Sequence, residues 1–308
     1  MIAFIFPGQG SQYAGMGKEL SDTFAVAKRV FEEADEALQF KLSSLCFNGP
    51  DESLRLTANT QPAILATSVA AYRVLESEMG LEPSYLAGHS LGEYSALVAS
   101  GALAFSDAVK TVRARGTFMQ EAVPVGTGAM AAILGLDAKE LGEVCRAAAK
   151  GEVVEPANFN SPGQVVIAGH VQAVERAIAL AKEKGAKKAM PLPVSAPFHC
   201  SLMTPAGLRL KDVLADIPVS EMKIPVVSNV EASPNADCAH IRDLLVRQVS
   251  APVRWEESVL KMVDLGVDRF VEVGPGKVLS GLLRRIAKGV SVGNLEDPAS
   301  LKNLQANF

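Results

Sequence analysis

The segment Gly88-His-Ser90-Leu-Gly92 constrains the fold more than any other part of the sequence. The apolar run Ser84-Tyr-Leu-Ala-Gly88 comes directly before it, and a helix-forming stretch follows. A Gly-x-Ser-x-Gly pattern between a strand and a helix is typical of a tight turn that exposes the serine at the end of a buried strand. We therefore expect Ser90 to be a nucleophile, with the backbone N–H of Leu91 facing a developing oxyanion. The alternative is a tight turn with a structural role only.

Two other short apolar runs, Ile2–Phe6 and 270–273, indicate further buried strands, because a Pro/Gly turn follows each of them at once. Helical stretches alternate with these strands along the chain. This alternation predicts an α/β fold in which helices cover both faces of a mostly parallel sheet.

The middle of the chain has a different order of elements. Strand, helix, strand, strand, helix, strand is the order of the ferredoxin-like split unit. We therefore expect a small ferredoxin-like subdomain at 124–196, inserted in a large α/β domain formed by 1–123 and 197–308. The elements expected in the insertion are strands at 128–136, 153–157, 164–168 and 188–194, and helices at 137–150 and 171–184.

Charge and cysteine content disfavour several classes of function. The 30 Lys and Arg residues against 34 Asp and Glu give a net charge of −4, so nucleic-acid binding is not expected. The cysteines form no Cys-x-x-Cys pattern, so no metal site is expected. The longest stretch without Asp, Glu, Lys or Arg, 189–208, contains prolines and is not expected to cross a membrane. Unpaired thiols and an N-terminus without a basic signal region favour a cytoplasmic protein.

A neutral serine needs a base within hydrogen-bond reach. His199 lies in the segment Pro197-Phe-His199-Cys, where the chain returns from the insertion to the large domain. It is expected to be either the base of Ser90 or a buried histidine with a structural role. Since no carboxylate stands out as its partner, a carbonyl is expected to orient it in a Ser-His dyad. The other histidines are expected beneath the turn or at the surface: His89, His170 and His240.

Two further features allow more than one interpretation. The loop Pro7-Gly-Gln9-Gly-Ser-Gln12 lacks the third glycine of a dinucleotide fingerprint. It is either a flexible turn or a close backbone approach that supplies a second oxyanion donor. Arg115 has apolar neighbours three and four residues away on a helix expected from Ser106 to about Gln120. It is expected to form an ion pair, to extend its head to solvent, or to bind a substrate carboxylate.

These motifs together resemble the malonyl-CoA:acyl carrier protein transacylase family, over essentially the whole chain. In order along the sequence they are Phe6-Pro-Gly-Gln-Gly-Ser-Gln12, Gly88-His-Ser-Leu-Gly-Glu93, Arg115-Gly-Thr-Phe-Met-Gln120, 158–169, Pro197-Phe-His199, Gln248-Val-Ser-Ala-Pro-Val-Arg-Trp255 and Val271-Glu-Val-Gly-Pro-Gly-Lys277.

The resemblance implies a hydrolase-like α/β core with a ferredoxin-like insertion, and it implies a role for each matching residue. Ser90 would be the nucleophile, His199 its base, and Arg115 the ligand of the malonyl carboxylate. The remaining roles are the oxyanion donors Gln9 and Leu91, the base-orienting carbonyl of Gln248, and the cleft-lining side chains Gln61 and Asn160.

The resemblance also implies an acyltransferase that moves a malonyl group from malonyl-CoA to acyl carrier protein through a malonyl-serine ester. No permanently bound cofactor is expected, because the coenzyme A thioester is a substrate and the partner carries phosphopantetheine. The chain is expected to act as a monomer. Phe198, directly before His199, resembles the residue at this position in malonyl-selective acyltransferase domains of polyketide synthases. The alternatives are a serine thioesterase, a carrier-binding module without catalysis, and an acyltransferase that prefers methylmalonyl or acetyl.

Carrier proteins of this kind are acidic, so a positive docking face is expected on a chain whose net charge is −4. The candidates are Lys187-Lys188 and Arg284-Arg285 with Lys288. The alternative for each cluster is an ordinary solvated face.

Overall fold

The computed structural model describes residues 1–194 and 196–307, and its larger sheet is built around β1 (Ile2–Phe6). Ile2, Phe4 and Phe6 pack into a core on one face of this sheet, and Ala3 and Ile5 pack into a core on the other. Successive side chains of a strand point to opposite faces, so a fully apolar strand needs cover on both.

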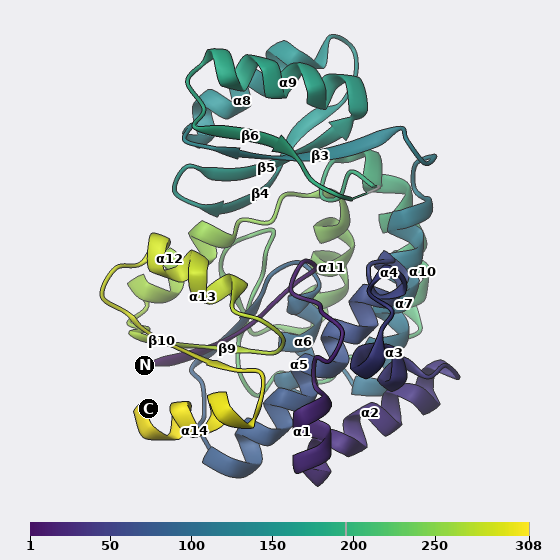
Figure 1. Ribbon diagram of the computed structural model, residues 1–308, viewed down its shortest axis with the longest axis vertical. Coiled ribbons are helices and arrows are strands. Elements are labelled where there is room, and N and C mark those ends of the chain that lie inside the picture. Colours follow the sequence, from purple (N-terminus) through teal and green to yellow (C-terminus); the bar gives the residue numbers. More distant parts are fainter. Residues whose placement is uncertain (195, 308) are drawn as a thin grey trace.

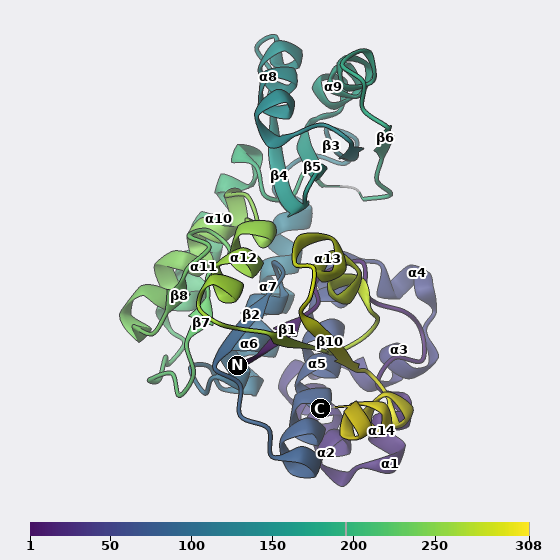
Figure 2. The same ribbon diagram turned by 90° about the vertical axis from the view of Figure 1, so that its left-hand side faces the viewer.

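The larger sheet has the strand order β10-β9-β1-β2-β7-β8. Neighbouring strands from β10 to β7 pair in parallel, and β8 pairs with β7 in the antiparallel sense. Two helices cover one face, α5 (Thr57–Met79) and α6 (Gly92–Ala99), and two cover the other, α12 (Trp255–Asp264) and α13 (Val278–Ile286) (Figures 1 and 2). The other strands of this sheet are β2 (Tyr85–Gly88), β7 (Val226–Val227), β8 (Pro234–Asn235), β9 (Arg269–Val273) and β10 (Ser291–Leu295).

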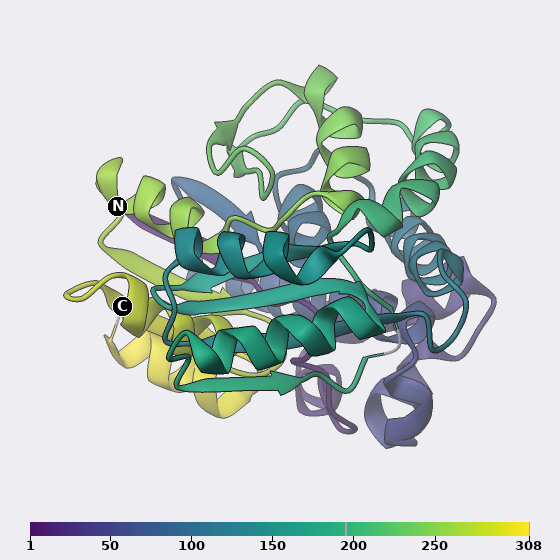
Figure 3. The same cartoon turned by 90° about the horizontal axis from the view of Figure 1, so that it is seen from above.

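The second sheet is antiparallel, with the order β4-β5-β3-β6, and it lies at the top of the molecule in Figure 1. Helices α8 and α9 cover its outer face, as Figure 3 shows from above, and they enclose a separate apolar core with it. Its elements follow the order β3 (Gly128–Leu134), α8 (Ala138–Ala149), β4 (Val154–Ser161), β5 (Gln164–His170), α9 (Val171–Glu183) and β6 (Lys188–Pro191).

The predicted fold class is confirmed: an α/β structure with a mostly parallel sheet and a separate small antiparallel sheet. Two predicted strand bounds are wrong by three or more residues, and the strands expected to end at 136 and 168 end at Leu134 and His170. The last strand of the insertion was expected at 188–194 and ends at Pro191, because proline lacks the N–H that a ladder needs and Pro193 follows. The strand expected at 153–157 continues to Ser161 through irregular pairing after Pro156 and Phe159.

Among the described residues, no helix is both long enough and apolar enough to cross a membrane. The helices other than α8 and α9 surround the larger sheet. These helices are α1 (Lys18–Thr23), α2 (Ala25–Leu38), α3 (Leu42–Asn48), α4 (Asp51–Leu54), α5 (Thr57–Met79), α6 (Gly92–Ala99), α7 (Phe105–Glu121), η1 (Ser201–Met203), α10 (Thr204–Ala215), η2 (Cys238–His240), α11 (Ile241–Ser250), α12 (Trp255–Asp264), α13 (Val278–Ile286) and α14 (Pro298–Asn307).

Candidate active site

Ser90 lies in the turn between β2 and α6 with a φ of 52°, a left-handed conformation. Such a backbone is strained for serine and persists only where the surroundings fix it. The two flanking glycines allow the chain to pack closely here. A Cβ at Gly88 would lie 1.9 Å from the carbonyl carbon of Gly92, and a Cβ at Gly92 would lie 2.1 Å from the backbone oxygen of Phe6.

His199 comes to this turn from the segment that follows the small sheet. Its Nε2 lies 2.7 Å from Ser90 Oγ, and its Nδ1 lies 2.9 Å from the backbone oxygen of Gln248. Since a carbonyl only accepts hydrogen bonds, Nδ1 carries the hydrogen and Nε2 presents its lone pair to the serine hydroxyl. Burial, and after it the positive charge of Arg115, lower the pKa of His199 to about 3. The imidazole is therefore neutral at neutral pH and can accept a proton.

Arg115, on α7, is 1% exposed, so its charge is held away from water. Its Nη1 donates to Gln61 Oε1 at 2.8 Å, and its Nη2 donates to Ser90 Oγ at 3.1 Å and to Gln248 Oε1 at 3.0 Å. All of its hydrogen-bond partners among residues 1–194 and 196–307 are uncharged. Burial lowers the pKa of Arg115, but a guanidinium stays protonated in proteins. A cation in this position can bind a carboxylate strongly.

Two backbone N–H groups beside Ser90 remain available to a ligand. Those of Gln9 and Leu91 donate to no acceptor among the described residues. The loop that carries Gln9 lies directly on the turn, because a Cβ at Gly8 would be 2.4 Å from the backbone oxygen of His89. Ser11 Oγ donates to the backbone oxygen of Gly8 at 2.8 Å and fixes the loop from within.

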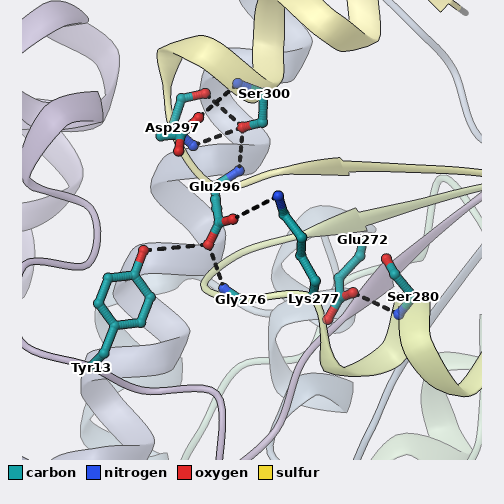
Figure 4. Close-up of polar contacts among 8 residues, drawn as sticks. All are labelled: Tyr13, Glu272, Gly276, Lys277, Ser280, Glu296, Asp297 and Ser300. Atoms are coloured by element: carbon teal, nitrogen blue, oxygen red, sulfur yellow. Dashed lines mark hydrogen bonds and ion pairs between the residues drawn. The ribbon is translucent and has the colours of Figure 1, made fainter.

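Glu296, directly after β10, holds the same loop from outside (Figure 4). Its Oε2 accepts a hydrogen bond from the Tyr13 hydroxyl at 3.3 Å and from the backbone N–H of Gly276 at 2.8 Å. Lys277 Nζ lies 3.5 Å from Oε1 of the same carboxylate. Burial, and after it the charge of Glu296, raise the pKa of Tyr13 to about 12, so this hydroxyl stays a donor. The carboxylate thus joins the N-terminal loop to the turn after β9.

Two buried polar residues of the site were missed by the sequence analysis. Asn229 accepts a hydrogen bond from the backbone N–H of Ser90 and donates one to the backbone oxygen of Gly88, both at 2.7 Å. It therefore clamps the strained turn. Glu93, 3% exposed, accepts hydrogen bonds at Oε2 from the backbone N–H of Asn229 at 3.0 Å and from Gln248 Nε2 at 2.8 Å. Glu93 ends a motif quoted above, whereas nothing in the sequence around Asn229 signals its role.

The candidate residues surround a cavity of about 120 Å³ between the two sheets. Asn160 is not part of its lining. Its Oδ1 instead accepts a hydrogen bond from His89 Nε2 at 2.8 Å. His89 itself faces the cavity and lies against Trp255, with ring centroids 5.7 Å apart, although we expected it beneath the turn. The lining consists of Gln9, Gln61, His89, Ser90, Leu91, Arg115, Met119, Met130, Asn158, Leu192, Val194, Phe198 and His199.

The other two histidines lie away from this cavity. His170 ends β5, and its Nδ1 accepts a hydrogen bond from the backbone N–H of Val153. His240 is exposed next to Asp237. In the part of the chain that the structure describes, no group of three or more His, Cys, Asp or Glu residues could hold a metal ion.

Comparisons with known proteins identify the family of this chain. The family described as acyl transferase domain matches residues 3–305. A malonyl CoA-acyl carrier protein transacylase of Bacillus subtilis strain 168 is 53% identical over 302 residues, which cover 98% of this chain and 95% of the relative. The protein of the same name from Escherichia coli O157:H7 is 52% identical over 300 residues, 97% of each chain.

Solved structures give the same result. An acyl carrier protein S-malonyltransferase from Vibrio cholerae has a TM-score of 0.96 and 52% identity, and the match covers 98% of this chain and 99% of that one. A malonyl-transacylase in complex with its type II PKS acyl-carrier protein has a TM-score of 0.97 and 48% identity, with 100% of this chain and 99% of that one covered. The family resemblance drawn from the motifs is thereby confirmed, and the chain belongs to the acyl transferase family, among the malonyl CoA-acyl carrier protein transacylases.

Proposed function

We propose that this enzyme transfers a malonyl group from malonyl-CoA to the phosphopantetheine thiol of acyl carrier protein, through an ester on Ser90. One observation supports it above all: Ser90 Oγ lies 2.7 Å from His199 Nε2 and 3.1 Å from Arg115 Nη2. A nucleophile, a neutral base and a buried cation thus share one small cavity. The names of relatives at about half identity supply the substrate and the carrier.

In the first half-reaction, Ser90 Oγ attacks the thioester carbonyl carbon while His199 Nε2 takes the hydroxyl proton. The N–H groups of Gln9 and Leu91 hold the tetrahedral oxyanion, an interaction typically worth about 3 kcal/mol per donor. The carbon–sulfur bond breaks, and the imidazolium returns its proton to the departing sulfur. Coenzyme A leaves as a thiol, and the malonyl group remains as an ester on Ser90.

Arg115 binds the free carboxylate of the malonyl group through this cycle. Its guanidinium is already oriented by Gln61 and Gln248, so little side-chain freedom is lost when the carboxylate binds. An acetyl group offers no anion to this buried cation. Arg115 therefore favours an acyl group with a second carboxylate.

In the second half-reaction, the phosphopantetheine thiol gives its proton to His199 and attacks the ester carbon. The carbon–oxygen bond breaks, the proton passes from His199 to Ser90 Oγ, and malonyl-carrier protein leaves. The two halves are separate, so the enzyme follows ping-pong kinetics. Attack, proton transfer and oxyanion stabilisation all have protein groups, and on this basis we assign no permanently bound cofactor.

The division into domains and the cellular location belong to the same proposal. Residues 124–196 form a small domain with its own core, and 1–123 with 197–308 form the catalytic domain; Ser195 and Phe308 lie outside the described residues. The thiols of Cys46, Cys145, Cys200 and Cys238 are unpaired, which is typical of a reducing compartment such as the cytoplasm.

Intact mass spectrometry after incubation with malonyl-CoA tests the function. We expect one added malonyl group, located on the Ser90 peptide, and its transfer to holo-acyl carrier protein when that protein is added. Ser90→Ala should show no adduct. A reaction that gives mostly free malonate in the presence of the carrier would favour a thioesterase, and an adduct that persists in Ser90→Ala would exclude the proposed ester.

A further inference from the structure

Arg115 is a fully buried cation whose hydrogen-bond partners within the described residues are neutral. A buried charge without a counter-ion is costly, so an anion is expected near it even before an acyl group binds. Glu93 is the carboxylate that the hydrogen-bond network connects to it. The connection runs through one side chain, that of Gln248.

The carboxamide of Gln248 can have only one orientation in this network. Its Oε1 accepts from Arg115 Nη2 at 3.0 Å, and a guanidinium can only donate. Its Nε2 donates to Glu93 Oε2 at 2.8 Å and to the backbone oxygen of Ser90 at 3.0 Å, and both of these only accept. The amide dipole therefore points its oxygen at the cation and its nitrogen at the anion. The backbone of the same residue orients His199.

The charges around Glu93 leave Arg115 as its main electrostatic partner. Burial raises the pKa of Glu93 to about 7, and hydrogen bonds from Asn229 and Gln248 and the charge of Arg115 oppose this rise. Two titratable groups nearby are neutral. Burial raises the pKa of Tyr94, so its hydroxyl stays protonated, and burial lowers the pKa of His199, so its imidazole stays unprotonated. The exposed groups on the surrounding elements pair with one another: Arg247 with Asp243 on α11, and Arg247 with Glu231 after β7.

We propose that Glu93 is the counter-ion of Arg115 until an acyl carboxylate binds, and that it takes up a proton from solvent when that carboxylate arrives. This inference rests on the proposed function, because it needs an acyl group that carries a carboxylate. Two anions then compete for one guanidinium in a site of low dielectric. The one that can be neutralised without leaving the site is Glu93.

The sign of the pH dependence follows from this competition. Binding of a carboxylate at Arg115 raises the pKa of Glu93 above its value in the unliganded protein. Malonyl-CoA therefore binds more weakly as pH rises through about 7, because each molecule bound must bring a proton with it. Acetyl-CoA carries no carboxylate, so its binding is free of this dependence. Glu93 thus sets how strongly the enzyme discriminates between the two acyl groups at a given pH.

Calorimetric titration of full-length Ser90→Ala with malonyl-CoA tests this without turnover. Titrations at about pH 7 in two buffers of different ionisation enthalpy give the number of protons taken up. We expect a substantial fraction of one proton with malonyl-CoA and none with acetyl-CoA. Between about pH 6 and pH 8 the malonyl-CoA dissociation constant should rise by up to about tenfold.

The matched variant is Ser90→Ala with Glu93→Gln. Both hydrogen bonds of Glu93 go to Oε2, so a glutamine amide oxygen can accept both. This variant should take up no proton, and its malonyl-CoA affinity should equal that of the parent at low pH and no longer weaken at high pH. The control is Glu272→Gln, another buried carboxylate, which accepts backbone N–H bonds from Leu279 and Ser280 at the start of α13 and is not linked to Arg115. Figure 4 shows the bond from Ser280. It should leave the proton uptake unchanged.

Proton uptake that persists in Glu93→Gln, or that is equal for acetyl-CoA, overturns the inference. If the Glu93→Gln variant does not fold, the comparison of malonyl-CoA with acetyl-CoA in the Ser90→Ala parent still decides it. Failure of the proposed function looks different, because no malonyl adduct forms on Ser90 of the unmodified enzyme. An enzyme that forms the adduct but shows no proton uptake keeps its function and loses only this role of Glu93.

Discussion

In the proposed mechanism, Arg115 acts in opposite senses on two groups, the base His199 and the acyl carboxylate. Burial is the main cause that lowers the pKa of His199, and the charge of Arg115 is the second. Both weaken the imidazole as a base. A malonyl carboxylate would replace Glu93 as the counter-ion of this guanidinium on the side that faces Ser90 and His199, so we expect it to raise the pKa of His199 again. We therefore expect the malonyl group to strengthen His199 as the base of Ser90, and an acetyl group not to do so. On this proposal, discrimination at Arg115 affects the rate of acyl transfer as well as binding.

Arg115→Ala should lower malonyl transfer by about 100-fold or more while it spares or improves acetyl transfer, because only the malonyl group loses a charged partner. Single-turnover loading from each thioester, followed by quenched mass spectrometry, measures both rates. Arg113→Ala on the same helix is the control. Its guanidinium lies over the Phe40 ring at 4.6 Å, so its loss should affect stability without any preference between the substrates. Equal losses for both thioesters in Arg115→Ala would contradict a carboxylate-binding role.

The turn between β2 and α6 depends on a contact between neighbouring elements. Gly92 begins α6 where that helix crosses the end of β1, and an added Cβ would be 2.1 Å from the Phe6 oxygen and 2.9 Å from the Pro7 oxygen. These are backbone atoms in a buried strand and its turn, which cannot move aside as a flexible side chain can. The helix must therefore shift away from β1, and Ser90 with it.

Gly92→Ala should reduce the free energy of unfolding by about 3 kcal/mol and abolish malonyl-serine formation, since it both overpacks the core and displaces the nucleophile. Urea unfolding and intact mass measure the two effects. Gly281→Ala is the matched control on α13, where an added Cβ meets no atom within 4 Å. It should raise the free energy of unfolding by about 0.5–1 kcal/mol and leave loading intact. A stable Gly92→Ala that loads normally would show that the crossing tolerates a side chain.

Much of this element-level arrangement is predictable from the sequence, and what is missed has a physical cause. Strands β1, β2 and β9 are short apolar runs stopped by Gly or Pro, and the elements of the small sheet alternate in the expected order. Strand β7 has only two residues, and β10 contains Gly293 and Asn294, so neither has a periodic signal. Their pairing is decided by neighbours far away in the sequence.

The residues of the site are likewise predictable only where a local sequence pattern marks them. Ser90 and the loop of Gln9 are visible because local chemistry demands glycines around them. His199 and Arg115 are visible only as residues with more than one interpretation. Asn229 owes its position to bonds with Ser90 and Gly88, more than a hundred residues earlier, so no local pattern could have identified it.

At the scale of the whole molecule, the two sheets are joined directly beside the cavity. The backbone of Val253, before α12, exchanges hydrogen bonds with β4: it donates to Ala157 and accepts from Phe159, both at 2.9 Å. Arg285 on α13 donates to Gln164 Oε1 on the small sheet at 2.8 Å. These contacts join parts of the chain that are far apart in sequence, and Asn158, which lies between the two β4 residues, lines the cavity. We therefore expect a carrier protein that delivers its thiol to Ser90 to contact both parts.

Helix α13, which carries Arg284 and ends just before Lys288, contacts β4 at this junction and lies below the small sheet in Figures 1 and 2. Arg284 and Lys288 are exposed and make no ion pair within the described residues, whereas Arg285 already bonds to Gln164. An acidic carrier would approach a protein whose net charge is −4, so we expect the unpaired charges of Arg284 and Lys288, close to the contact of α13 with the small sheet, to attract it.

Replacing Arg284 and Lys288 together by glutamate should raise the KM for acyl carrier protein by about tenfold or more at low salt. The effect should shrink as ionic strength rises, because salt screens exposed charges. Malonyl loading of Ser90 should not change, since neither residue lines the cavity. Steady-state transfer at several salt concentrations measures the first effect, and intact mass measures loading.

Lys302→Glu on α14, at the far end of the molecule from the small sheet, is the control for net charge (Figure 1). Lys302→Glu changes the net charge by −2 and the double variant changes it by −4. A rise in log KM half as large with Lys302→Glu would therefore assign the effect to overall charge, and an unchanged KM in the double variant would move the docking face to Lys187 and Lys188.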